Sequence, residues 1–168
     1  MRHHTKDKGD QGLGFVIADL MASGIHVALP ISEHLPFDCI AINSAGDMKR
    51  VSVKYRTAPK GVIDCRKRSS WVDRRGVHYK KHTPGSYDAF AIYCPDTKQC
   101  YYVREEESSG SLRLRITKPR GTNGIAARFA DEFKNPERLF VPVAQLDEQQ
   151  PSKLLDAGSS PVGDTHEH

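Results

Sequence analysis

The chain has 168 residues, of which 38% are apolar and 27% are charged, and its formal net charge is +4. This length and apolar content supply one ordinary core but not two, so we expect one soluble globular domain. The N-terminus is polar and no apolar run approaches the roughly 20 residues of a membrane-spanning helix, which predicts a cytoplasmic protein with no membrane partner.

The basic residues are concentrated in one segment of the chain. Residues 49–81 hold twelve Lys or Arg against two acids, whereas residues 141–168 hold one lysine against five acids. Such a basic excess favours a polyanion as partner, because each phosphate that is neutralised releases counterions. A solvated basic loop with no partner is the alternative reading of the same charges.

In chain order, residues 1–9 are polar and predict a flexible N-terminus. Asp10 is a credible N-cap for a helix over residues 11–23, where apolar residues recur at helical spacing. Gly24 then ends the helix, and residues 26–31 predict a short edge strand, since Pro30 disfavours a central position in a sheet.

Two neighbouring strands are predicted next, over residues 35–42 and 48–56, with a turn of small residues between them. Asp38 lies near the start of the first strand and Lys54 near the end of the second, so an antiparallel pairing brings them to the same end of the sheet. An edge-of-sheet ion pair is the structural alternative to a chemical site at this position.

Further strands follow a basic excursion. Residues 61–65 and 69–72 predict one or two short strands, and residues 87–94 and 100–103 predict the clearest hairpin of the chain. Apolar residues at i, i+4 and i+8 predict a second helix over residues 124–133. This order predicts an α/β or α+β fold, with helices on a mixed central sheet, in a domain over residues 10–140. The four cysteines contain no CxxC pair, and reduced packing residues are favoured over a disulfide or a metal site.

Four segments in this order carry a resemblance to a known family: residues 8–13, 36–38, 50–54 and 87–93. Together they resemble the PD-(D/E)XK endonucleases, and within them the bacterial group I intron homing endonucleases, over residues 8–133. The resemblance implies a restriction-endonuclease-like core and a homing-type DNA endonuclease that depends on Mg²⁺ or Mn²⁺. P-loop, GxGxxG, HExxH and GxSxG motifs are absent from the sequence, so other common chemistries lose their usual support.

The resemblance also implies roles for individual residues. Asp38 matches the principal metal ligand, the peptide carbonyl of Val53 matches a further ligand, and Lys54 matches the catalytic lysine that orients water and stabilises negative charge. Ser52 stands where the family has Glu, Asp or Gln, and is expected to be an auxiliary position.

The first helix departs from the family pattern as well, because Leu13 stands where many members have a glutamate. Asp10 lies one turn earlier on the same face, and we expect it to compensate as an auxiliary catalytic acid. With Ser52 and Leu13 at these positions, a DNA-binding protein that has lost cleavage is the alternative function. A structural or RNA-associated basic protein is a third reading.

Double-stranded DNA is the expected partner, with phosphate contacts from basic residues that follow the catalytic lysine: Arg56, Lys60, Arg66, Lys67, Arg68, Arg74 and Arg75. A duplex target favours a homodimer or homotetramer. Residues 141–168 are turn-rich and predict a disordered tail. Residues 144–147 and 158–161 can be encoded by sequences like the D-arm and T-arm of a tRNA gene, so we interpret the tail as read-through into such a gene.

Overall fold

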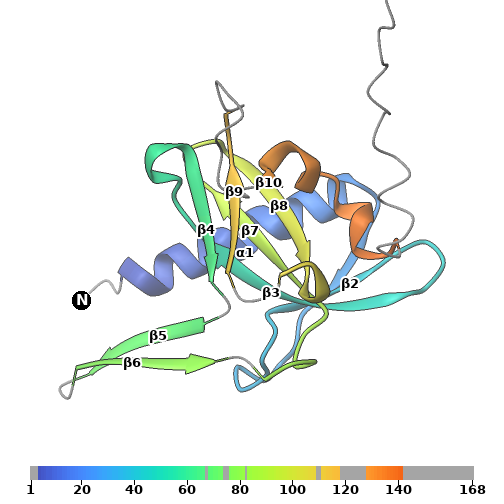
Figure 1. Ribbon diagram of the computed structural model, residues 1–168. Coiled ribbons are helices and arrows are strands. Elements are labelled where there is room, and N and C mark those ends of the chain that lie inside the picture. The colour runs from blue at the N-terminus through green and yellow to red at the C-terminus, as the bar shows by residue number, and fades with distance from the viewer. Residues whose placement is uncertain are drawn as a thin grey trace, which may run out of the picture.

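The computed structural model describes residues 4–66, 68–73, 76–81, 83–108, 111–117 and 128–141. Its largest unit is a five-stranded sheet with strand order β1-β2-β3-β7-β8, and α1 (His4–Ala22) packs on one face of this sheet (Figure 1). The strands are β1 (His26–Ala28), β2 (Cys39–Ile42), β3 (Met48–Tyr55), β7 (Ala89–Cys94) and β8 (Gln99–Arg104). The pairing of β3 with β7 is parallel and the other pairings are antiparallel, so the sheet is mixed.

The chain between β3 and β7 and the chain after β8 build the remaining strands. A second sheet has the order β10-β9-β4, and a separate hairpin pairs two further strands. These elements are β4 (Val62–Arg66), β5 (Arg68–Asp73), β6 (Gly76–Lys81), β9 (Ser111–Arg115) and β10 (Arg128–Phe129). The described residues also form four 3-10 helices: η1 (Pro59–Gly61), η2 (Glu105–Glu107), η3 (Ala130–Phe133) and η4 (Pro136–Leu139).

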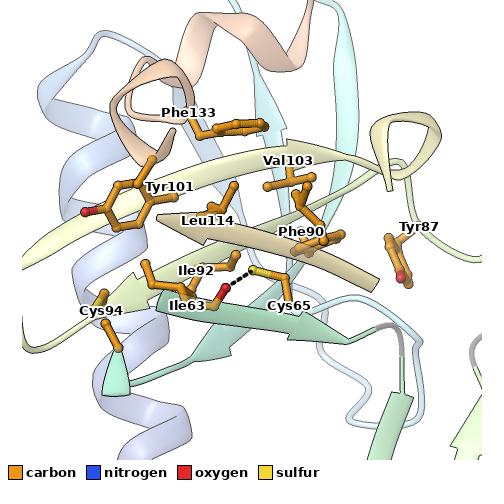
Figure 2. Close-up of a cluster of buried hydrophobic side chains, with 13 residues drawn as sticks. Ile63, Cys65, Tyr87, Phe90, Ile92, Cys94, Tyr101, Val103, Leu114 and Phe133 are labelled. Carbon is orange, nitrogen blue, oxygen red and sulfur yellow. Dashed lines mark hydrogen bonds between the residues drawn. The ribbon is translucent and has the colours of Figure 1, made fainter. Parts of the chain in front are cut away.

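The five-stranded sheet is the middle layer, because both of its faces are buried. Every residue of β7 is buried, and alternate residues face opposite sides of the sheet. Ala89, Ala91 and Tyr93 pack with Val16 and Leu20 of α1. On the other face, Phe90 and Ile92 belong to a second buried cluster (Figure 2). The second sheet contributes Ile63 and Leu114 to this cluster, and η3 contributes Phe133.

The helix is held close to the sheet at two points. Gly12 is buried, and a Cβ atom at this position would lie 3.5 Å from Cβ of Tyr55 and 3.6 Å from Cγ1 of Val53. The phenol of buried Tyr102 donates a hydrogen bond of 2.6 Å to Oδ2 of Asp19. The N-terminal half of α1 therefore lies against the end of β3, and its C-terminal half is joined to β8.

The α+β architecture, the two predicted hairpins and the strands of the basic excursion are confirmed, although β2 begins at Cys39 and not at residue 35. The structure adds the strands β6, β9 and β10. Two predictions about helices are wrong. Asp10 is not an N-cap, because α1 begins at His4 and includes residues 4–9. The helix expected over residues 124–133 is absent from its described part, where Arg128 and Phe129 pair in parallel with β9 and residues 130–133 form η3.

The predicted tail lies outside the described residues, apart from residue 141. All four cysteines are free and buried, as expected for packing residues. Burial raises the pKa values of Cys39, Cys65 and Cys100 to about 12. A search of the described residues for a helix with the length and hydropathy of a membrane span finds none.

Candidate active site

Asp38 lies at the point where the pairing of β2 with β3 begins. Its N–H donates to the carbonyl of Val51 at 2.9 Å, and the ladder then runs from Cys39, which lies opposite Val51. The preceding residue, Phe37, packs against the core between the two sheets. The side chain of Asp38 nevertheless remains exposed, because the strand starts only after it. This position puts an accessible carboxylate beside the second half of β3.

The carboxylate of Asp38 is held through one of its two oxygens. Oδ2 accepts the N–H of Val53 at 2.5 Å and the hydroxyl of Ser52 at 3.3 Å. Both donors are neutral, and no hydrogen bond or ion pair from a described residue reaches Oδ1. Ser52 is itself buried, with 2% of its surface exposed. The arrangement fixes the direction of the carboxylate while leaving one oxygen available.

The carbonyl of Val53 points to the same side as its N–H. Along β3 the peptide groups alternate in direction: the carbonyl of Val51 accepts from Asp38 on the β2 side, and that of Arg50 accepts from Asp88 on the β7 side. Because the Val53 N–H is directed at Asp38, the Val53 carbonyl also faces the β2 side, beyond the start of β2. A carboxylate oxygen and a carbonyl oxygen therefore face the same open end of the sheet.

This donor set suits a hard divalent cation. Mg²⁺ prefers oxygen ligands, keeps several of its waters, and is often bound through one or two carboxylates together with substrate phosphates. Asp38 and Val53 supply one carboxylate and one carbonyl of this kind. Within the described residues no group of three or more His, Cys, Asp or Glu side chains gathers as a metal site. The remaining ligands would have to be water and phosphate oxygens.

Lys54 lies two residues beyond Ser52, on the same face of β3. It pairs in register with Ile92, whose side chain belongs to the core between the two sheets. Burial lowers the pKa of Lys54, the negative charge of Asp38 opposes this, and the cation of Arg56 adds to it. No direct ion pair joins Lys54 to Asp38 in the described chain. The charge of Asp38 therefore acts on the pKa of Lys54 without a direct ion pair between the two side chains.

The first helix does not bring its predicted acid into contact with this carboxylate. By strand alternation Ser52 and Lys54 point away from α1, which packs on the face that carries Val51. Asp10 is exposed on α1 and forms no hydrogen bond or ion pair with Asp38 among the described residues. Leu13 is half-buried and packs against the helix-side core. Packing against this core therefore explains why position 13 is a leucine.

The described members of the predicted phosphate-binding set lie between the end of β3 and the start of the β5–β6 hairpin, which projects from the body of the protein (Figure 1). Arg56 is half-buried and donates from Nη1 to the carbonyl of Tyr55 at 2.9 Å, and Lys60 is exposed in η1. Arg66 ends β4 and Arg68 begins β5. The others, Lys67, Arg74 and Arg75, lie outside the described residues.

One ion pair that sequence reasoning did not assign lies on the same face as Ser52. Arg50 donates from Nε to Oδ2 of Asp88 at 3.1 Å and from Nη2 to Oδ1 at 2.8 Å, and Nη2 also donates to the carbonyl of Gly85 at 2.9 Å. The hydrogen bonds from Arg50 hold the pKa of Asp88 below its usual value. Asp88 is thereby engaged as a structural link from β3 to the start of β7.

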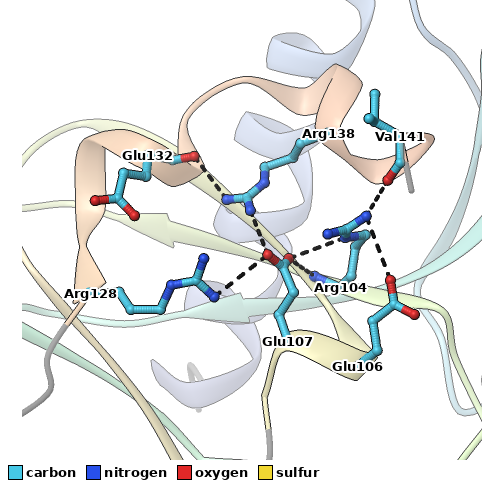
Figure 3. Close-up of polar contacts among 7 residues, drawn as sticks. All are labelled: Arg104, Glu106, Glu107, Arg128, Glu132, Arg138 and Val141. Atoms are coloured by element: carbon cyan, nitrogen blue, oxygen red, sulfur yellow. Dashed lines mark hydrogen bonds and ion pairs between the residues drawn. The ribbon is translucent and has the colours of Figure 1, made fainter. Parts of the chain in front are cut away.

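A second cluster that sequence reasoning missed surrounds Glu107, at the end of β8 (Figure 3). Its Oε2 accepts from the N–H of Arg104 at 3.0 Å and from Nε of the same residue at 3.3 Å. Its Oε1 accepts from Nη2 of Arg138 at 2.6 Å and lies 3.6 Å from Nη1 of Arg128. The ring of Phe133 packs against the guanidinium groups of Arg138 and Arg128. This cluster fastens the segment 128–141 to β8.

The chain is similar to known proteins in its sequence profile and in its fold. The profile of a family described as PD-(D/E)XK endonuclease matches residues 3–136 of the chain. Among solved structures, the bacterial homing endonuclease I-Ssp6803I has a similar fold, with a TM-score of 0.63 and 18% sequence identity over 88% of this chain and 99% of that chain. None of the curated proteins compared with the chain matches it.

Proposed function

The chain belongs to the PD-(D/E)XK endonuclease family, and from this premise we propose that it hydrolyses phosphodiester bonds of double-stranded DNA with the help of Mg²⁺ or Mn²⁺. The observation that carries the proposal is the capture of Asp38 through Oδ2 alone. A carboxylate held by neutral donors keeps its full charge, and its second oxygen stays available to a cation.

Asp38 and the carbonyl of Val53 would hold the metal ion, which when bound polarises the phosphate and lowers the pKa of a coordinated water. Hydrolysis forms a bond from the water oxygen to phosphorus and breaks a bond from phosphorus to a leaving oxygen of the DNA. The ammonium of Lys54 would stabilise the negative charge that develops on the phosphate. Ser52 acts through Asp38, whose orientation it fixes, and Asp10 remains an auxiliary candidate.

Basic side chains of residues 49–81 would bind the phosphates that flank the cleaved bond. The excess of Lys and Arg in this segment supports DNA over an uncharged partner. Site-specific, homing-type cleavage is proposed from the similarity of fold to a homing endonuclease. A duplex has two strands related by approximate symmetry, so a homodimer or homotetramer acting in the cytoplasm is part of the proposal.

A nicking assay on supercoiled plasmid tests this function. The wild-type chain should nick in Mg²⁺ or Mn²⁺ and not in EDTA. Asp38→Asn should slow nicking by at least about 10³-fold, since metal assistance contributes several kcal/mol to the barrier. Asp7→Asn, which changes an exposed carboxylate in the first turn of α1, is the matched control and should nick like the wild type.

The neutral residue Ser52, at a position where the family has an acid or an amide, favours one second candidate. In that case the chain binds DNA on the same scaffold without cutting it. Wild-type protein that shifts DNA in gels but never nicks, in either metal, would establish this alternative. Equal nicking by Asp38→Asn and wild type would refute the proposed site itself.

A further inference from the structure

The loop that leads into Asp38 is apolar and exposed. It spans residues 29–37, between β1 and β2, and we refer to it as the 29–37 loop. The exposed fraction is 57% for Leu29, 104% for Ile31 and 44% for Leu35. Single exposed apolar side chains are ordinary on protein surfaces, but several within one short loop beside a catalytic site indicate a binding surface.

Both ends of the 29–37 loop are fixed to the protein. On one side Ala28 pairs with Ile40 in the β1–β2 ladder, and on the other Phe37 packs against the core between the sheets. Pro30 and Pro36 restrict the backbone near each end of the exposed stretch. The exposed stretch is therefore anchored to the protein at both of its ends.

The position of the 29–37 loop next to Asp38 indicates which partner the loop would contact. The loop ends at Asp38, and Figure 1 shows it projecting from the body on the same side as the β5–β6 hairpin. This hairpin lies within the basic segment of residues 49–81. A duplex that places a phosphate at Asp38 would pass beside the 29–37 loop, because the loop ends at the residue before Asp38.

We propose that the 29–37 loop is a wedge that enters the stacked bases of the duplex beside the cleaved phosphate, with Ile31 at its tip. The inference rests on the proposed DNA cleavage. Leucine, isoleucine and proline side chains are the kind that separate base steps and kink DNA. Unstacking at this step would turn the neighbouring phosphate toward Asp38.

A change in DNA linking number tests the wedge without any cleavage. Relaxed plasmid is incubated with Asp38→Asn protein and a metal-independent type I topoisomerase in EDTA, and topoisomers are resolved after the protein is removed. Insertion between base pairs unwinds the duplex, so the parent should shift the topoisomer distribution. Adding Ile31→Ser and Leu35→Ser should abolish the shift while gel-shift binding persists through the basic segment. Adding Met48→Ser instead is the control, since Met48 is 66% exposed at the opposite end of the β2–β3 hairpin.

The outcomes separate the wedge from the proposed function. If the Ile31/Leu35 variant unwinds plasmid as much as the parent, the wedge is overturned. The wedge is also overturned if the Ile31/Leu35 variant alters the oligomeric state of the protein, measured by sedimentation, and leaves plasmid unwinding unchanged. The loop would then be an interface between copies of the chain. Nicking by wild type without any linking-number shift by the parent would leave the proposed function standing and remove the wedge. Protein that binds no plasmid at all would overturn both.

Discussion

Two carboxylates of this protein are held in opposite ways. Glu107 is 3% exposed and both of its oxygens contact arginine side chains, from Arg104, Arg128 and Arg138. Asp38 is exposed, and its one engaged oxygen accepts only from a peptide N–H and a hydroxyl. The same functional group is therefore neutralised at one end of the sheet and left charged at the other.

The difference separates a carboxylate that is occupied by structural contacts from the one that we propose to bind a metal ion. Buried arginines need a carboxylate, because an unpaired buried charge is costly, and the carboxylate is then occupied. A carboxylate that is oriented by neutral donors loses little of its capacity to bind a cation. Asp88, paired with Arg50, belongs with Glu107 in this respect, whereas Asp38 forms no ion pair with an arginine among the described residues.

Removing the structural carboxylate should have the largest effect on stability. Glu107→Gln leaves two buried guanidinium groups, of Arg104 and Arg138, without their anion. Arg138 is 5% exposed, and burial lowers its pKa even beside Glu107. Breaking such a buried pair should lower the free energy of unfolding by about 3–5 kcal/mol, as measured by urea denaturation.

Its neighbour supplies the control for this comparison. Glu106 is 60% exposed and only its Oε1 lies within 3.6 Å of Arg104. Glu106→Gln should change the free energy of unfolding by less than about 1 kcal/mol. Neither substitution should change the nicking rate of the folded protein. A loss of nicking in Glu107→Gln protein that remains folded would contradict the division into structural and catalytic acids.

The sequence predicted the local elements of the site because they depend on neighbouring residues. Alternating apolar residues around a short turn define the β2–β3 hairpin, and its antiparallel pairing is enough to place Asp38 beside β3. The family resemblance then supplied the roles of Asp38 and Lys54. The hydrogen bonds that hold Oδ2 of Asp38 follow from the register of these two strands alone.

The errors and omissions involve contacts between distant parts of the chain. Apolar spacing predicted a helix ending at Phe133, but this side chain is buried against the second sheet and contacts the guanidinium groups of Arg128 and Arg138. Glu107 and Arg138 are far apart in sequence, and no spacing rule joins them. The start of α1 was misplaced because the polar residues before Asp10 carry no apolar period, although they continue the helix.

Lys54→Met should separate catalysis from stability at the charged end of the sheet. Loss of its ammonium should slow nicking by about 100-fold, the scale of one electrostatic contact to a transition state. The folded protein should become more stable at neutral pH, because burial disfavours the lysine cation and methionine has none to desolvate. Urea denaturation at pH 7 and plasmid nicking measure the two effects.

The lowered pKa of Lys54 also predicts the direction in which the free energy of unfolding changes with pH. Burial lowers the pKa of Lys54 in the folded state, whereas the unfolded chain titrates at about 10.4. Between these two pKa values the unfolded state binds more protons than the folded state, so the free energy of unfolding rises with pH. Conversely, the free energy of unfolding falls as the pH is lowered toward and through the pKa of Lys54 in the folded state. Lys54→Met should remove this slope. Lys49→Met, on the same strand, is the control and should retain it; an unchanged slope in Lys54→Met would contradict burial as the cause.

Ser52→Ala tests one of the two hydrogen bonds that orient Asp38, and its expected effect is the smallest. It removes one of the two neutral donors to Oδ2 of Asp38, and the N–H of Val53 remains. A hydrogen bond as long as this one, 3.3 Å, contributes about 1 kcal/mol, so nicking at limiting Mg²⁺ should fall by about fivefold and saturating Mg²⁺ should restore most of the rate. A purely structural role would lower the rate equally at every Mg²⁺ concentration. A loss of about 100-fold or more would instead make the serine hydroxyl part of the metal site, because one positioning hydrogen bond is too weak to account for it.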